Sequence, residues 1–323
     1  MARILGMGNA LVDMLIRIDS DDPIKENNLI KGGMELVDWE IASKVLKSTE
    51  KYPRGQAAGG SAANTINGLA KLGVETGFIG KVGKDEIGDF FKSDMFDAGV
   101  NPQLAESDTP SGVAVGLISP DAERTFATYL GAAVELSADD LQAGMFEGYD
   151  YFHIEGYLVQ NYDLIERAVK LAKENGLKVS LDLASFNVVE ANLDFLKRIT
   201  KDYVDIIFAN EEEAKSFTGK EPEEAMHEIA ETVDYAIVKI GSRGSMVKHK
   251  GEVFTAGVIK ADSIDTTGAG DLFASGFLYG LHKNLPLGEA LRIGSVVAGN
   301  VIEVLGAKMD EERWQRIFKM MEA

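Results

Sequence analysis

Apolar and polar residues alternate along the first part of the chain. The residues at every second position from 12 to 18 are apolar, namely Val12, Met14, Ile16 and Ile18. A period of two predicts a strand with one buried face. A short apolar run at 3–8 predicts a buried strand before it. A polar loop at 20–28 and a short apolar–polar segment at 34–38 follow.

The next segments have helical spacing. Small and apolar residues recur at i, i+4, i+7 and i+8 over residues 61–72, namely Ala62, Ile66, Leu69 and Ala70. This spacing predicts an amphipathic helix that ends at Gly73. Further helices are expected at 39–49 and 87–98. Residues 113–118 and 125–130 predict a hairpin around the Pro120-Asp121 turn.

From residue 149 onward, apolar runs alternate with amphipathic segments. The expected strands are 149–154, 178–183, 204–209 and 235–240, and the expected helices are near 162–174, 191–200, 211–217 and 222–232. This alternation predicts a parallel, doubly wound sheet. A β-rich piece at 246–257 and long helices at 271–283 and 287–304 follow, before a last amphipathic helix that contains Trp314.

The strand-rich pieces do not suit the middle of a parallel sheet. We expect 11–38 and 112–130 to pair as a small β lid, and 1–10, 39–111 and 131–323 to form one large α/β domain. A lid would help an enzyme that must exclude water from a reactive group.

Composition narrows the function. The chain has 323 residues, with 45% hydrophobic and 26% charged residues, which is ordinary for a globular protein. A net charge of −19 argues against nucleic-acid and anionic-membrane partners, which need basic surfaces. No apolar run approaches the span of a membrane helix. The absence of cysteine excludes disulfides and thiolate sites and fits a cytoplasmic location.

The strongest chemical signal is Asp-Thr-Thr-Gly-Ala-Gly-Asp at 265–271. The free N–H groups of Gly268, Ala269 and Gly270, at a predicted helix N-terminus, would form an anion site that we call the glycine nest. A carboxylate beside an anion site suits a general base, which makes Asp271 the candidate catalytic residue. The alternative is that Asp271 only caps the helix after a glycine turn.

These seven residues resemble the C-terminal signature of the PfkB (ribokinase-like) family of sugar and nucleoside kinases. Gly59, Gly60 and Asn64 resemble the N-terminal signature of the same family, whose glycines let a sugar approach the backbone. The resemblance implies that Asp13 holds sugar hydroxyls, with Asn9 as a further substrate contact. The alternatives are a capped helix and an exposed strand carboxylate.

Two further motifs match the family in order along the chain. Asn210 and Glu213 fit its N-x-x-E motif, which implies a phosphate contact at Asn210 and Mg²⁺ organised by Glu213, through water. The alternative is an acidic first helical turn. Lys239, Gly241 and Gly244 fit its nucleotide loop, although hairpins use the same residues. Lys239 is a candidate phosphate contact, and the alternative is a charge that faces solvent.

Other assignments also follow from the resemblance. It implies K⁺ near Asp265 and the backbone of Thr267, and Asn300 is a candidate for the adenine pocket. Arg124 lies in the predicted hairpin, where closure would bring it to the substrate and its phosphates. There is no G-x-x-x-x-G-K-[ST] sequence, so a P-loop is excluded.

The resemblance implies a ribokinase-like three-layer α/β/α sandwich that transfers the γ-phosphoryl group of ATP to a hydroxymethyl group. Segments 8–13, 123–132 and 181–186 are similar to adenosine kinase and its bacterial relatives, so an adenosine-like nucleoside ranks first as acceptor. A free sugar such as ribose or fructose ranks second, and a non-catalytic nucleotide-binding regulator ranks third. The expected partner is this small molecule, with the chain as a monomer or homodimer.

Overall fold

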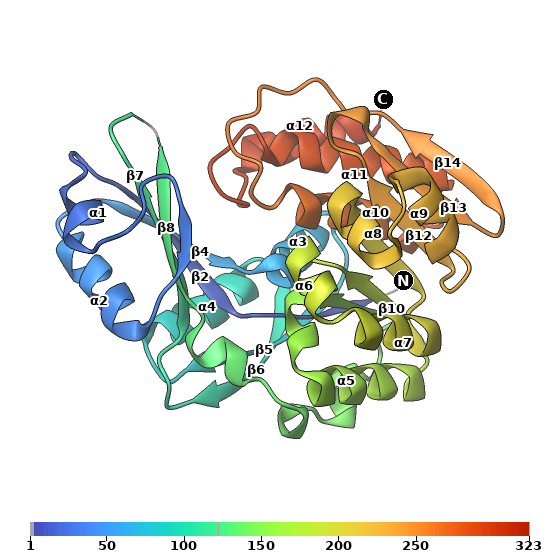
Figure 1. The fold of residues 1–323 in the computed structure, drawn as a ribbon, viewed down its shortest axis with the longest axis horizontal. Helices are drawn as coiled ribbons and strands as arrows, with labels where there is room; N and C mark the ends of the chain where they lie inside the picture. Colours follow the sequence, from blue (N-terminus) through green and yellow to red (C-terminus); the bar gives the residue numbers. More distant parts are fainter. Residues whose placement is uncertain (1–2, 122, 323) are drawn as a thin grey trace.

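The computed structural model describes residues 3–121 and 123–322, which form a large and a small β-sheet (Figure 1). The nine-stranded sheet has the order β14-β13-β12-β11-β10-β9-β1-β5-β6, and all neighbours from β12 to β6 are parallel. Its strands are β1 (Ile4–Met7), β5 (Thr76–Gly83), β6 (Val100–Ser107), β9 (Tyr151–Glu155), β10 (Lys178–Asp182), β11 (Ile206–Asn210), β12 (Tyr235–Lys239), β13 (Ser245–His249) and β14 (Glu252–Ala256).

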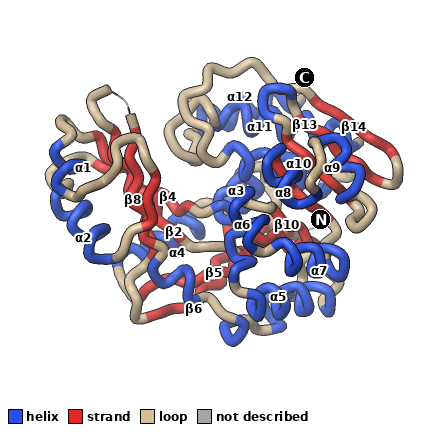
Figure 2. The backbone as a smooth tube through the Cα atoms, in the orientation of Figure 1, coloured by secondary structure: helices blue, strands red, loops and turns tan. Residues whose placement is uncertain are grey.

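Helices cover both faces of this sheet, as Figure 2 shows, whereas the first two helices of the chain lie beside the small sheet. The helices are α1 (Asp22–Glu26), α2 (Trp39–Ser48), α3 (Ser61–Lys71), α4 (Glu86–Asp97), α5 (Tyr162–Glu174), α6 (Phe186–Ala191), α7 (Leu193–Tyr203), α8 (Glu211–Thr218), α9 (Pro222–Ile229), α10 (Ala269–His282), α11 (Leu287–Val301) and α12 (Glu311–Met321). Side chains alternate along each strand, so Ile206 and Phe208 pack towards α3, α4, α10 and α11. Ile207 and Ala209 pack on the other face, towards α5, α7, α8 and α9.

The predicted elements agree with the structure in most of the chain. The strand β6, the short helices α1 and α6, and the 3-10 turns at Gly131–Glu135 and Gly156–Gln160 had no counterpart in the sequence prediction. These segments are short or lack a clear period, so their patterns carry little information.

The small sheet has five strands in the order β3-β8-β7-β2-β4. They are β2 (Leu11–Arg17), β3 (Met34–Leu36), β4 (Arg54–Gly59), β7 (Gly112–Ile118) and β8 (Arg124–Tyr129). The sequence prediction placed β4 in the large domain, and this is wrong for its pairing, since β4 runs antiparallel to β2. Its sequence, Arg-Gly-Gln-Ala-Ala-Gly, has no apolar alternation that would reveal a strand.

The order of the large sheet reverses at β1, which pairs with β5 on one side and with β9 on the other. In open α/β sheets, ligands bind outside the carboxyl ends of the strands at such a switch point. The carboxyl ends of β1, β9, β10, β11 and β12 and the residues that follow them therefore lie along one edge of the sheet.

Helices α10 and α11 approach closely because glycines lie between them. A Cβ on Gly276 would lie 2.8 Å from the backbone N and Cα of Gly294, and a Cβ on Gly280 would overlap Ala290. Backbone atoms cannot move aside as a flexible side chain can. This contact fixes the direction of α10 and hence the position of its N-terminus.

We expect Gly276→Ala to lower the free energy of unfolding by about 1–3 kcal/mol, because the new methyl group overlaps the α11 backbone. Gly288→Ala is the matched control, since a Cβ at this helical position meets nothing within 4 Å. Urea unfolding should leave the control equal to or slightly above wild type. Equal midpoints for both variants would contradict the close-packing interpretation.

Candidate active site

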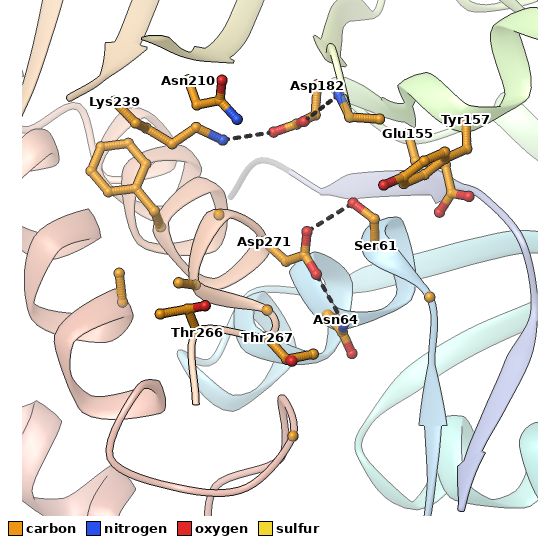
Figure 3. Close-up of a pocket in the computed structure, with 18 of the residues that line it drawn as sticks. Ser61, Asn64, Glu155, Tyr157, Asp182, Asn210, Lys239, Thr266, Thr267 and Asp271 are labelled. Atoms are coloured by element: carbon orange, nitrogen blue, oxygen red, sulfur yellow. Dashed lines mark hydrogen bonds and ion pairs between the residues drawn. The ribbon is translucent and has the colours of Figure 1, made fainter. Parts of the chain in front are cut away.

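A cavity of about 1530 Å³ lies between the carboxyl edge of the large sheet, the small sheet and the N-terminus of α10. Figure 3 shows its central part, where Asp271 faces Ser61 and Asn64, and Lys239 points at Asp182. Most residues assigned from the sequence line this cavity, namely Asn9, Asp13, Gly60, Asn64, Asn210, Glu213, Lys239, Gly241, Gly244, Thr267, Gly268, Ala269, Gly270 and Asp271.

Asp271 lies in the first turn of α10 and is held by α3. Its Oδ1 accepts a hydrogen bond from Oγ of Ser61 at 2.8 Å, and its Oδ2 accepts one from Nδ2 of Asn64 at 2.9 Å. Burial raises its pKa to about 6, although these two hydrogen bonds oppose the rise. Ser61 was not predicted, although its place beside Gly60 at a helix start was a usable signal.

The glycine nest begins at Gly268, whose φ of 74° is left-handed and so favours glycine. The N–H of Ala269 donates to the carbonyl of Thr266 at 3.1 Å. The prediction that Ala269 supplies a free anion donor is therefore wrong in this conformation, because the turn uses that N–H. Gly268 and Gly270 keep their places on the cavity wall.

Asp13 lies on β2, and Gly59 and Gly60 lie at the end of β4, so the small sheet positions all three residues. Gly59 does not line the cavity. A Cβ there would overlap the carboxylate of Asp13, so Gly59 makes room for that group. Gly60, with a φ of 101°, has no space for a Cβ beside the carbonyl of Asn9. Burial, followed by the charge of Asp271, raises the pKa of Asp13 to about 7.

Asn9 links β1 to β9 at the switch point. Its backbone N and its Nδ2 both donate to Oε1 of Glu155, at 2.9 and 2.6 Å, and Oε2 of Glu155 accepts from the N of Ala62 at 3.0 Å. Burial raises the pKa of Glu155 to about 7. Glu155 was not predicted, and an acidic residue before a glycine at a strand end was the available signal.

Asn210 and Glu213 form a capping box at the start of α8. Asn210 donates from its N and Nδ2 to the carboxylate of Glu213, at 2.7 and 2.6 Å, and its Oδ1 accepts from the N of Glu213 at 2.9 Å. The alternative given for the motif was an acidic first helical turn, and Glu211, Glu212 and Glu213 do lie in the first turn of α8. Burial and then the charge of Asp182 raise the pKa of Glu213 to about 7, so a cation would relieve this carboxylate.

The residues on the nucleotide side follow β12. Gly241 and Gly244 have φ values of 56° and 101°, and both line the cavity. Nζ of Lys239 lies 3.2 Å from Oδ2 of Asp182, at the end of β10. Asp182 was not singled out in the sequence, although it follows an apolar strand.

Asn300, Arg124 and Asp265, like Gly59, do not line the cavity. Asn300 is buried inside the α11–α12 contact, where its Nδ2 donates to the carbonyl of Val296 at 2.8 Å. Its neighbours Ala298 and Gly299 line the cavity instead. Arg124 does not line the cavity either, because its guanidinium pairs with the carboxylate of Asp265.

The pairing of Asp265 also bears on K⁺. Thr267 donates its N and Oγ1 to Oδ1 of Asp265, at 2.9 and 2.7 Å, while Oδ2 accepts from Gly306 at 2.8 Å and from Arg124. A carboxylate has about four lone-pair positions. All are used, so this donor set does not fit a K⁺ ion at Asp265.

Two properties of the described residues concern metal binding and membrane insertion. Within residues 3–121 and 123–322, no group of three or more His, Cys, Asp or Glu side chains is placed to hold a metal ion directly. No helix in the same part of the chain is long and apolar enough to cross a membrane.

The fold and the cavity define an α/β enzyme with a carboxylate at the N-terminus of a helix, facing a large ligand site. The family model "pfkB family carbohydrate kinase" matches residues 44–313. The chain belongs to the PfkB family, and it is a phosphotransferase that acts on an alcohol group. The predicted family and fold class are thereby confirmed.

Individual relatives differ in their named substrates. The chain is 31% identical to the 5-dehydro-2-deoxygluconokinase of Shouchella clausii (strain KSM-K16), over 86% of this chain and 90% of the relative. A structure from Rhizobium etli CFN 42 described as "probable sugar kinase protein" has a TM-score of 0.85 and 32% identity, covering 98% of both chains. The adenosine kinase from Sinorhizobium meliloti has a TM-score of 0.84 and 31% identity, covering 98% and 99%.

The site's buried carboxyls predict how stability depends on pH. Because the folded pKa of Asp13 is about 7 against an ordinary 3.8, its contribution to stability is present below pH 4 and is lost as the pH rises to 7. We expect Asp13→Asn to flatten the decline in unfolding free energy between pH 5 and 7.5, with a gain at pH 7.5 on the order of 1 kcal/mol or more.

Chemical denaturation at pH 5 and at pH 7.5 measures the unfolding free energy of each variant. Asp97→Asn, which replaces an exposed carboxylate on α4, is the control and should keep the wild-type slope. An unchanged slope in Asp13→Asn would show that Asp13 is not the desolvated group that the structure indicates.

Proposed function

We propose that this kinase transfers the γ-phosphoryl group of ATP to the hydroxymethyl group of a ribonucleoside with an adenosine-like base. The observation that carries the proposal is an apolar wall on the acceptor side of the cavity. Leu11, Leu15, Phe126 and Tyr157 form this wall, and all four line the cavity.

Exposed apolar residues extend this wall. Met34 and Leu36 on β3 also line the cavity, yet they are 71% and 73% exposed. Exposed apolar clusters at a cavity mark ligand or partner sites. A flat heteroaromatic base would cover such side chains, whereas a free sugar would leave its hydroxyls facing groups that cannot hydrogen-bond.

The polar part of the acceptor side suits a ribose. Asp13 and Asn64 both face the region beside Asp271, and Gly60 leaves the backbone open to a ring. A carboxylate can accept hydrogen bonds from two neighbouring hydroxyls. In this arrangement the ribose hydroxymethyl group points towards Asp271 and the base lies against the small sheet.

Asp271 is the general base of the proposed reaction. Its carboxylate takes the proton of the hydroxymethyl group as the new O–P bond forms, while the bond between the γ-phosphorus and the bridging oxygen breaks and ADP leaves with that electron pair. A pKa of about 6 leaves Asp271 ionised at neutral pH but basic enough to accept the proton. Gly268 and Gly270 supply backbone dipoles to the phosphoryl oxygens.

The negative charge near Asn210, where the N-x-x-E motif is expected to contact the phosphate donor, suits Mg²⁺. Glu213 and Asp182 carry closely spaced negative charge, and Glu213 already uses both oxygens with Asn210, so it would organise Mg²⁺ through water rather than bind it directly. The metal would neutralise charge on the phosphate oxygens. The small sheet is proposed to act as a lid that keeps water from the phosphoryl group.

A free-sugar kinase is the second candidate, favoured by the 86% coverage of the match to the 5-dehydro-2-deoxygluconokinase named above. A small acyclic or cyclic sugar acid would occupy the polar part of the site around Asp13 and Asn64. It would leave the apolar wall uncovered.

We expect Asp271→Asn to lower kcat by at least about 10²-fold, because the amide cannot accept the proton. The melting temperature should change little, since an amide oxygen can still accept from Ser61 or Asn64. Steady-state phosphorylation with Mg-ATP measures the effect, and Asp310→Asn, at the remote N-cap of α12, is the control for a carboxylate-to-amide change at a helix start. Turnover near the wild-type value would exclude Asp271 as the base.

We expect adenosine to exceed ribose and fructose in kcat/KM by well over about tenfold, since the base adds apolar contact area. Phe126→Ala should raise KM for adenosine while leaving KM for ATP unchanged, because Phe126 lies on the acceptor side. If ribose or fructose reacts as efficiently as adenosine, or 5-dehydro-2-deoxygluconate reacts better, the apolar wall does not bind a base.

A further inference from the structure

The charge lining the cavity is strongly one-sided. Seven carboxylates line it, namely Asp13, Glu155, Asp182, Glu211, Glu212, Glu213 and Asp271. Among the described residues of the lining, Lys239 is the one cationic side chain. The carboxylates that are ionised repel a phosphate chain that enters this cavity, and Lys239 is the cation of the lining that can offset this repulsion.

The ammonium group of Lys239 lies at the glycine nest. A Cβ placed on Gly270 would be 3.1 Å from Nζ of Lys239, so the ammonium and the nest border the same space. Only 17% of the Lys239 side chain is exposed. Burial lowers its pKa, but the charges of Asp182 and Glu213 outweigh this and raise it, so Lys239 stays protonated.

Asp182 holds the ammonium in this place. Its Oδ1 accepts from the N of Ala184 at 2.9 Å, and its Oδ2 faces Nζ of Lys239 at 3.2 Å. Ala184 has a φ of 64°, a left-handed conformation that costs a non-glycine residue free energy. This strained conformation directs the N–H of Ala184 to Oδ1 of Asp182, and it thereby orients the Asp182 carboxylate.

His153 does not compete for this role. It is fully buried, and its Nδ1 lies 3.0 Å from Oγ of Ser180. Burial lowers its pKa to about 4, so the ring is neutral at pH 7. The local positive charge is therefore that of Lys239.

We propose that Lys239 binds the phosphoryl group during transfer and that Asp182 is its positioning residue. Before the donor binds, the ammonium is bonded to Asp182. The ammonium has three N–H donors. When the phosphate chain enters, some of these N–H groups donate to the phosphoryl oxygens, while the bond to Asp182 keeps the ammonium beside the nest. The inference rests on the proposed function only in that the donor carries a phosphate chain.

Inorganic tripolyphosphate is the probe, because it needs no acceptor. We expect isothermal titration to show binding to Lys239→Met that is at least about tenfold weaker than to wild type. Asp182→Asn should have the opposite effect, roughly threefold tighter binding or more, because the amide oxygen can still orient the ammonium while the negative charge that repels the phosphates is gone. A structural pair would give weaker binding in both variants.

Lys81→Met is the matched control. Lys81 forms a similarly sheltered pair with Asp140, at 3.0 Å and with side chains 15% and 19% exposed, and it does not line the cavity. Its tripolyphosphate affinity and kcat should equal those of wild type, whatever happens to its melting temperature. Circular dichroism establishes folding, and if Lys239→Met does not fold, Asp182→Asn alone decides by the sign of its change in affinity.

Turnover supplies the second measurement. With an accepted alcohol, Lys239→Met should lower kcat by about 10²–10³-fold, the range for loss of one transition-state donor, while KM for the acceptor stays constant. If wild type ignores adenosine but the tripolyphosphate contrast persists, the proposed acceptor is wrong and this inference stands. Wild-type kcat and tripolyphosphate affinity in Lys239→Met, or weaker binding in Asp182→Asn, would overturn it.

Discussion

The structure depends on one electrostatic constraint, which is that several carboxylates must stay in a sheltered cavity without losing their hydrogen bonds. An ionised group removed from water is costly unless donors satisfy it. Four of these carboxylates, those of Asp271, Glu155, Asp182 and Glu213, are met by donors from another element or from a helix cap. Asp271 joins α10 to α3, Glu155 joins β9 to β1 and α3, and Asp182 joins β10 to β12. The bonds that orient the chemical groups are therefore also bonds that hold the layers together.

Much of the fold was predictable because its signals are local. Period-two and period-3.6 patterns depend only on which side of an element is buried, and the parallel sheet follows from the order of strands and helices. The glycine nest was predictable for a similar reason, because seven consecutive residues determine both the turn and the start of α10. Even there, the Thr266–Ala269 hydrogen bond depends on turn geometry that composition does not reveal.

The missed features depend on partners that are distant in sequence. Arg124 looked like a free cation of a hairpin, yet it pairs with Asp265 on the loop before α10. Asn300 was assigned by its place near the end of a helix, but which face of α11 meets α12 could not be deduced from spacing alone. Asp182 and Glu155 are single acidic residues at strand ends, and only the assembled sheet shows that they share one cavity.

The path of β4 has a mechanical consequence. This strand belongs to the small sheet, and after Gly60 the chain continues directly into α3, whose first residue is Ser61. No loop separates the two elements that could absorb a displacement. A tilt of the small sheet would therefore move the first turn of α3, whose Ser61 and Asn64 hold the Asp271 carboxylate. On the proposed function, acceptor binding against the small sheet and the orientation of Asp271 would be linked through two peptide bonds rather than through a long chain of side-chain contacts.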